Sequence, residues 1–130
     1  RPLLKQKAEQ TSIAGQQAEQ AASLFLQQQG YTLLDQNYRF KGGEIDLILR
    51  NNKRLLFAEV RMRNNPHYGD GAESVTYAKQ RRISRTALHY LQRHPQFDAY
   101  DLRFDVLSAT HDGQQYQFNW FKEAFWPGDN

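Results

Sequence analysis

Two strand-like runs, separated by a three-residue turn, constrain the fold of this chain most strongly. Residues 44–50 read EIDLILR and residues 54–63 read RLLFAEVRMR, with an Asn-Asn-Lys turn at residues 51–53. Side chains alternate between the two faces of a strand; in the second run one face is apolar throughout, whereas the other begins apolar with Leu55 and Phe57 and ends charged. The polar turn predicts that the two strands form an antiparallel hairpin.

The spacing of apolar residues elsewhere in the chain predicts two helices. One is expected to begin at Ser12 and to end before Gly30, and the second to run from about Val75 to Arg93, where Pro95 ends it. Residues 1–11 are polar with little periodicity and are expected to form a flexible tail.

Three further strands are expected, at residues 31–40, 101–110 and 115–121, while residues 64–74 have the Pro and Gly content of a loop. The order αβββαββ predicts an α/β fold with a mixed central sheet flanked by helices. The length of 130 residues fits a single domain, expected over residues 12–130.

Composition excludes several classes of site. The chain has no cysteine, which excludes thiolate metal sites and a cysteine nucleophile, and its four histidines lack the spacing of a zinc site. The net charge of +3 suits a polyanion such as nucleic acid without requiring one. The apolar runs are too short to span a membrane and the chain shows no export leader, so a cytoplasmic protein is expected.

The alternation of side chains along the central strands (their parity) is expected to bring ionisable residues together. Glu59 and Arg61 share one face of their strand, and a tight hairpin would bring Asp46 within cross-strand reach of Glu59. Two close carboxylates repel one another, and a bound Mg²⁺ or Mn²⁺ removes that repulsion, binds phosphate oxygens and activates water. With Arg61 stabilising the negative charge of the transition state, these residues fit a phosphodiesterase site.

A purely structural interpretation stays open for each of these residues. A Glu-x-Arg pair on a half-exposed strand is often a surface ion pair. The acid Glu19, on the first helix, could belong to a solvated face, and Glu44 could face the same cleft as Asp46 by parity.

Four sequence blocks, in this order along the chain, resemble the YraN-like family of small bacterial proteins. The blocks are GGEIDLI from Gly42, AEVRMR at 58–63, SVTYAKQRRISRTALHYL at 74–91 and LRFDVL at 102–107. The resemblance covers residues 14–126. It implies a restriction-endonuclease-like fold with the PD-(D/E)xK signature, and a layout similar to archaeal Holliday-junction resolvases.

The resemblance also implies roles for individual residues. Asp46 and Glu59 correspond to metal-binding acids, Glu19 to the helical acid that completes the site, and the carbonyl of Val60 to a further metal contact. The cofactor would be Mg²⁺ or Mn²⁺. Arg61 stands where the signature usually has lysine; arginine cannot act as a base but can bind phosphate oxygens bidentately.

The function expected from this resemblance is that of a Mg²⁺-dependent DNA endonuclease acting on branched or damaged DNA. Arg63, Lys79 and Arg82 are the candidate phosphate contacts, and a homodimer is compatible with cutting two strands. The alternative is a catalytically inactive nucleic-acid-binding module with the same fold; an adaptor that binds another protein is a third.

Two other groups of residues are assigned structural roles. Arg103 and Asp105 are expected to form a structural pair. The aromatic residues near the C-terminus are expected to seal the core, with a stacking platform for unpaired bases as the alternative; they are Trp120, Phe121, Phe125 and Trp126.

Overall fold

The computed structural model describes residues 2–63 and 75–126, with side chains from Ile13 onward. Within these residues, two α-helices and five strands form the expected order αβββαββ, so the predicted mixed α/β fold is confirmed. The elements are α1 (Pro2–Gln28), β1 (Thr32–Phe40), β2 (Gly43–Asn51), β3 (Arg54–Met62), α2 (Tyr77–Arg93), the 3-10 turn η2 (Pro95–Phe97), β4 (Asp101–His111) and β5 (Tyr116–Phe121).

The five strands form one sheet in the order β1-β2-β3-β4-β5. The first three strands are an antiparallel meander that includes the predicted hairpin of β2 and β3, and β4 and β5 form a second antiparallel pair. β3 and β4 are parallel, because α2 returns the chain to the end of the sheet where β3 starts, and β4 begins there. This crossover makes the sheet mixed.

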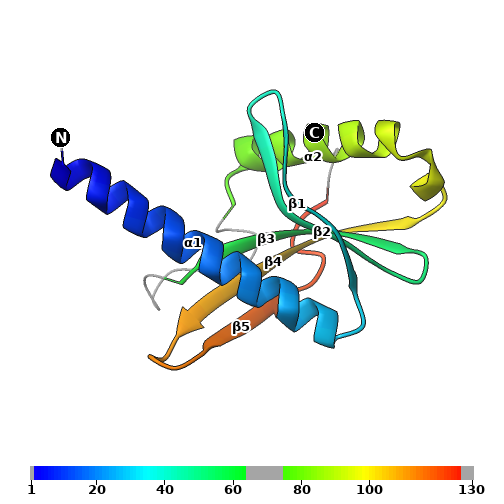
Figure 1. Cartoon of the computed structure of the whole chain (residues 1–130). Helices are drawn as coiled ribbons and strands as arrows, with labels where there is room; N and C mark the ends of the chain where they lie inside the picture. The colour runs from blue at the N-terminus through cyan, green and yellow to red at the C-terminus, as the bar shows by residue number, and fades with distance from the viewer. Residues whose placement is uncertain (1, 64–74, 127–130) are drawn as a thin grey trace.

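The two helices cover different faces of the sheet, as Figure 1 shows. We call the apolar cluster beneath α2 the α2-side core; it includes Ile48, Phe57, Ile83 and Phe104. The α1-side core lies on the opposite face and includes Ala22, Leu26, Leu47, Leu49 and Leu56. The central strands are therefore buried on both faces, which explains why apolar residues occur at successive positions in β2 and β3.

The first helix differs from its prediction. α1 begins at Pro2, ten residues before Ser12, and its N-terminal part extends beyond the sheet (Figure 1). The prediction that the helix begins at Ser12 is therefore wrong. Lys, Gln, Ala and Glu dominate this stretch and favour helix without an apolar stripe, so hydrophobic periodicity does not detect it.

The C-terminal aromatic residues divide between core and surface. Phe125 is buried against Phe104, and Trp120 and Phe121 pack against the two cores. Trp126 is 54% exposed, so its predicted place in the core is wrong. The loop predicted at residues 64–74 lies outside the described residues.

The pair Arg103 and Asp105 has the structural role that was expected. The guanidinium of Arg103 donates to the Asp105 carboxylate, with Nη2 at 2.8 Å from Oδ2, and both residues are buried. Asp105 also accepts hydrogen bonds from Trp120 Nε1 at 2.7 Å and from the backbone amide of Glu123 at 3.0 Å. This buried carboxylate thus connects β4 to β5 and to the segment that follows it.

A glycine brings α2 close to the start of β2. A Cβ atom on Gly43 would lie 2.2 Å from Thr86 Oγ1 and 2.8 Å from the backbone oxygen of Arg82. The helix can therefore approach the strand this closely only because position 43 has no side chain. Because Glu44 is the next residue, this contact fixes the backbone from which the Glu44 side chain extends.

Candidate metal centre

The hydrogen-bonded ladder between β2 and β3 ends beside two acidic residues. Backbone pairing runs from Asn51 opposite Arg54 to Leu47 opposite Ala58. Beyond this point, hydrogen bonds from backbone amides to side chains replace the backbone ladder. Asp46 Oδ2 accepts from the amide of Val60 at 2.8 Å, and Glu59 Oε2 accepts from the amide of Asp46 at 3.3 Å. The predicted cross-strand proximity of Asp46 and Glu59 is thus confirmed.

The alternation of side chains along β2 is interrupted at this point. Ile45 and Ile48 both pack in the α2-side core, although residues three apart should face opposite ways, and Leu47 packs in the α1-side core. The change of face falls at Asp46, where the strand has left the β3 ladder. Asp46 is thereby turned toward α1.

Three carboxylates converge where β2 faces α1. One carboxylate oxygen from each of Glu19, Glu44 and Asp46 lies within 4.8 Å of the others. Glu19 comes from the middle of α1, and Glu44 and Asp46 come from the first half of β2. All three are partly buried. We call this group the carboxylate cluster; Glu44 faces the same cleft as Asp46, as parity suggested.

Two side chains of β1 hold the outer carboxylates in place. Asn37 Nδ2 donates to Glu19 Oε1 at 2.8 Å and to Glu44 Oε1 at 3.3 Å. Arg39 Nε donates to Glu44 Oε2 at 2.6 Å. Asn37 has a left-handed backbone conformation, with φ of 51°, close to an irregularity in the β1–β2 register. This conformation, which asparagine tolerates well, directs its amide toward both acids.

Glu59 lies beside the carboxylate cluster rather than within it. It follows Phe57 on the face of β3 that meets the α2-side core, and it is only 2% exposed. The amine of Lys79, from the first turn of α2, lies 3.8 Å from Glu59 Oε1. The Thr76 hydroxyl caps this helix by accepting from the amide of Lys79 at 3.2 Å, which fixes the position of the lysine backbone.

Burial makes the acids of this region hard to ionise. Burial raises the pKa of Asp46 to about 6; the hydrogen bond from Val60 opposes this, and the charge of Glu19 adds to it. Burial and then the charge of Asp46 raise the pKa of Glu59 well above its usual range, against the opposing charge of Lys79. The pKa of Glu19 is also raised, mainly by burial. A cation placed among these groups would favour their ionised forms.

The structure places the predicted metal ligands and basic residues as follows. It brings Glu19 and Asp46 together, and the third member of the cluster is Glu44, where Glu59 was predicted. Arg61 lies two residues beyond Glu59 on β3, opposite Ser108 of β4. Other basic residues lie at the end of β3 and on α2; these are Arg63, Lys79 and Arg82.

The oxygen donors of the carboxylate cluster fit a hard divalent cation. Carboxylate oxygens are the ligands that Mg²⁺ and Mn²⁺ prefer, and one or two protein carboxylates with water and phosphate oxygens complete a Mg²⁺ site. The oxygens of Glu19 and Asp46 lie close enough to share one ion. The cluster could thus hold a cation between α1 and β2.

Asn37 and Arg39 are site residues that the sequence does not predict. Both lie on β1, and their contacts depend on the pairing of β1 with β2. The only local signal was an asparagine in the interior of a strand, where this residue is disfavoured. Its unusual conformation has a role in the site.

Comparison with known proteins places the chain among bacterial relatives. The profile described as "Uncharacterised protein family UPF0102" matches residues 18–109. A UPF0102 protein of Nitrosomonas europaea is 45% identical over 111 residues, covering 85% of this chain and 92% of the relative. UPF0102 proteins of Legionella pneumophila and Vibrio parahaemolyticus are 41% and 43% identical; each alignment covers 88% of this chain, with 96% and 93% of the relatives.

One solved structure, "The structure of Pyrococcus Furiosus SfsA in complex with Ca2+", matches with a TM-score of 0.33 and 9% identity. The match covers 78% of this chain and 58% of that chain. None of the described helices is long and apolar enough to cross a membrane.

Proposed function

We propose that this chain, which belongs to the UPF0102 family, is a Mg²⁺- or Mn²⁺-dependent nuclease that hydrolyses phosphodiester bonds in DNA. The observation that carries the proposal is the convergence of Glu19, Glu44 and Asp46 within 4.8 Å, from two elements far apart in sequence. The pKa values of Glu19 and Asp46 are raised, and acids with raised pKa values that converge from separate elements are typical of a functional site.

The residues of the carboxylate cluster would hold the cation, with Asp46 as the central ligand. Asn37 and Arg39 orient the carboxylates of Glu19 and Glu44, so these ligands are preorganised. When bound, the cation would lower the pKa of a water molecule and neutralise charge on the phosphate under attack.

Glu59 and Lys79 would act next to the cluster. Lys79 opposes the rise in the pKa of Glu59, so it favours the carboxylate form that can accept a hydrogen bond from water. The amide of Asp46 fixes the other oxygen of Glu59. Glu59 could thus orient water at the edge of the cluster, a role distinct from the direct metal binding first predicted for it.

Arg61 would bind the phosphate rather than act as a base. An arginine side chain cannot serve as a base in a protein, and its planar guanidinium can contact two phosphate oxygens at once. Exposed Arg82 would contact neighbouring phosphates of the same strand, together with Arg63 at the end of β3. The resemblance to archaeal Holliday-junction resolvases supports branched or damaged DNA as the substrate, and a homodimer would supply two sites for two strands.

The test is cleavage of defined DNA by the purified chain. Labelled single strand, duplex, flap and four-way junction are incubated with Mg²⁺, Mn²⁺ or EDTA. We expect metal-dependent cleavage of at least one branched substrate, and a loss of more than about 100-fold in Asp46→Asn, because removing a metal ligand removes the activated water. Mn²⁺ binding by the two proteins is compared by calorimetry.

The matched control is Asp98→Asn, which makes the same chemical change at an exposed residue in the turn before β4. If no DNA is cut and Asp46→Asn binds Mn²⁺ as the unaltered protein does, the nuclease proposal is wrong. DNA binding that persists in EDTA without cleavage would instead support an inactive nucleic-acid-binding module.

A further inference from the structure

A groove lies between α2 and β4, on the α2 side of the sheet. Its volume is about 630 Å³, within the range of roughly 300–1,000 Å³ that is usual for ligand pockets. The residues that line it are of two kinds, an apolar group and an arginine-rich group. The apolar residues are Ala78, Ala87, Leu88, Leu91, Leu102 and Phe104; the polar ones are Arg81, Arg82, Ser84 and Arg85.

The apolar lining is open to solvent at its edge. Leu88 is 56% exposed, whereas Ala87 and Phe104 belong to the α2-side core. The groove thus joins the core of the protein to its surface through a continuous apolar lining. A concave apolar surface of this kind, rimmed by charged residues, is typical of a binding site.

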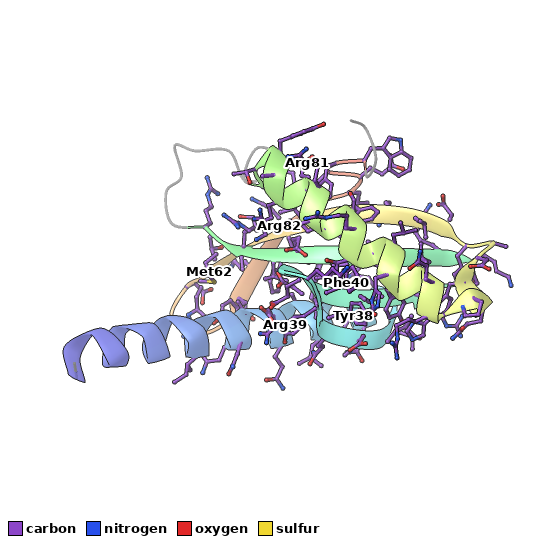
Figure 2. All side chains as sticks on the ribbon, turned by 90° about the horizontal axis from the view of Figure 1, so that it is seen from above. Tyr38, Arg39, Phe40, Met62, Arg81 and Arg82 are labelled. Atoms are coloured by element: carbon purple, nitrogen blue, oxygen red, sulfur yellow. The ribbon has the colours of Figure 1, made fainter. Side chains whose placement is uncertain are left out.

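The charged lining is entirely basic. Arg81, Arg82 and Arg85 are exposed, and the described lining residues include no acid. The guanidinium of Arg81 lies 5.4 Å from the ring centroid of Tyr77, which restrains it near the start of α2. Figure 2 shows Arg81 and Arg82 at this end of the helix. Three clustered guanidinium groups favour an occupant with several negative charges.

We infer that this groove binds unpaired nucleotides of a DNA strand. Phosphates would contact Arg81 and Arg85, and bases would pack against Leu88 and the apolar floor. A duplex presents phosphates but keeps its bases stacked inside, so it could not use the apolar lining. A single strand offers both surfaces at once. Charge and apolar area therefore both favour the unpaired strand.

The inference rests on the proposed nuclease function and specifies its substrate. α2 carries Lys79, which contacts Glu59 beside the carboxylate cluster, and it also carries the arginines of the groove. The groove and the Lys79–Glu59 pair thus share the N-terminal half of α2. The substrate class would be DNA in which an unpaired segment adjoins the bond that is cut, as in a flap or branch.

The experiment measures binding of a fluorescent oligothymidine by anisotropy in EDTA, across a salt series. The double variant Arg81→Gln/Arg85→Gln should reduce the slope of log K against log salt by about 1.4, since each phosphate contact with a single strand contributes about 0.7. Leu88→Ser should weaken binding roughly three- to tenfold with an unchanged slope, because it removes apolar contact alone.

Matched controls exist for both changes. Leu24→Ser alters a leucine on α1 that is also 56% exposed, and Arg93→Gln alters an exposed arginine at the far end of α2; neither lines the groove. Both controls should bind the oligonucleotide as the unaltered protein does, and thermal melting should show that all the variants are folded.

Three results would overturn the inference. The first is an equal loss of oligothymidine affinity in Leu88→Ser and Leu24→Ser. The second is an equal loss of affinity in Leu88→Ser for a duplex of the same length. The third is full competition by a polyaspartate peptide of equal charge, which would indicate an acidic protein partner. Asp46→Asn should retain oligonucleotide binding in EDTA. If the unaltered protein cuts no DNA but the groove variants change oligonucleotide binding as expected, only the nuclease proposal is contradicted. Cleavage by the unaltered protein without a groove effect contradicts only this inference.

Discussion

The Oδ2 atom of Asp46 accepts a hydrogen bond from the backbone amide of Val60 at 2.8 Å, at the position where the β2–β3 ladder has ended. The carboxylate thus replaces the backbone acceptor that a continuing antiparallel strand would supply. This contact satisfies a partly buried donor and holds Asp46 at the gap between the strands. Asparagine can preserve the hydrogen bond through its carbonyl oxygen, so Asp46→Asn isolates the role of the charge.

The first prediction concerns the pH dependence of stability without metal. The folded protein keeps the Asp46 proton up to about pH 6, whereas its ordinary pKa is 3.8. The folded state thus binds more protons between these values, and its free energy of unfolding falls as the pH rises through this window. Relative to Asp46→Asn, the unaltered protein should lose roughly 1–3 kcal/mol between pH 4 and pH 6.5.

Urea denaturation in EDTA measures this difference in the free energy of unfolding. The comparison with Asp46→Asn removes the contribution of groups that titrate in both proteins. Above the window the Asn variant should be the more stable of the two. A constant difference across the whole pH range would contradict the raised pKa. Adding Mn²⁺ near neutral pH should stabilise the unaltered protein more than the variant, because the ion binds the ionised carboxylate.

The second prediction decides which acid completes the candidate metal site. Glu44→Gln and Glu59→Gln remove one charge each, but only Glu44 lies in the group within 4.8 Å. We expect Glu44→Gln to weaken Mn²⁺ binding by at least about 10–100-fold, which is the loss typical when a residue that supports a metal ligand is changed. Glu59→Gln should weaken Mn²⁺ binding less. Calorimetric titration at pH 7.5 measures both affinities.

Glu123→Gln is the control for this comparison, because Glu123 is exposed beyond β5. A larger loss of Mn²⁺ affinity in Glu59→Gln than in Glu44→Gln would restore the ligand set first predicted from the sequence, with Glu59 as the third acid.

The third prediction concerns the ion pair between Glu59 and Lys79. Lys79→Met removes the cation that lies 3.8 Å from a carboxylate that is only 2% exposed. We expect a loss of about 1–2 kcal/mol, below the 3–5 kcal/mol of a fully buried pair, because the lysine is partly exposed. Chemical denaturation at pH 8 measures it.

A double-mutant cycle tests whether the loss arises from the pair itself. Glu59→Gln removes the buried charge, so Lys79→Met should cost much less in that background. If Lys79→Met is equally destabilising with Gln at position 59, the lysine acts through other contacts.

The fourth prediction compares two glycines. Gly43→Ala would place a Cβ atom 2.8 Å from the backbone oxygen of Arg82, which cannot move without shifting α2, so we expect a loss of about 1–3 kcal/mol. Gly15→Ala meets no atom within 4 Å and lies within α1, so it should stabilise the protein by roughly 0.5–1 kcal/mol.

Thermal and urea denaturation measure both glycine variants. Because Glu44 follows Gly43, the Gly43→Ala variant should also bind Mn²⁺ less tightly than Gly15→Ala. Equal stability of the two variants would show that α2 adapts to a side chain at position 43.

The elements of the sheet were predictable because their sequences are governed by local rules. The two strand-like runs and the polar turn at residues 51–53 are sufficient to predict the central hairpin, and with it the proximity of Asp46 and Glu59. The start of α1 was not predictable in this way, because a helix without an apolar stripe lacks the periodic signal.

The composition of the carboxylate cluster depends on a feature that parity cannot reveal. Strict alternation would place Ile45 and Ile48 on opposite faces, yet both pack in the α2-side core. The change of face turns Asp46 toward Glu19 and leaves Glu59 with Lys79. Such irregularities arise from the competition between ladder and side-chain hydrogen bonds, which depends on tertiary contacts.

The origin of the carboxylate cluster on two separate elements links ion binding to assembly. Glu19 reaches the cluster only when α1 has docked on the sheet, whereas Glu44 and Asp46 are presented by the hairpin alone. An ion that needs all three would bind the docked state preferentially and would fasten the helix to the strands. The attachment of α1 would then respond to the concentration of divalent cations around the protein.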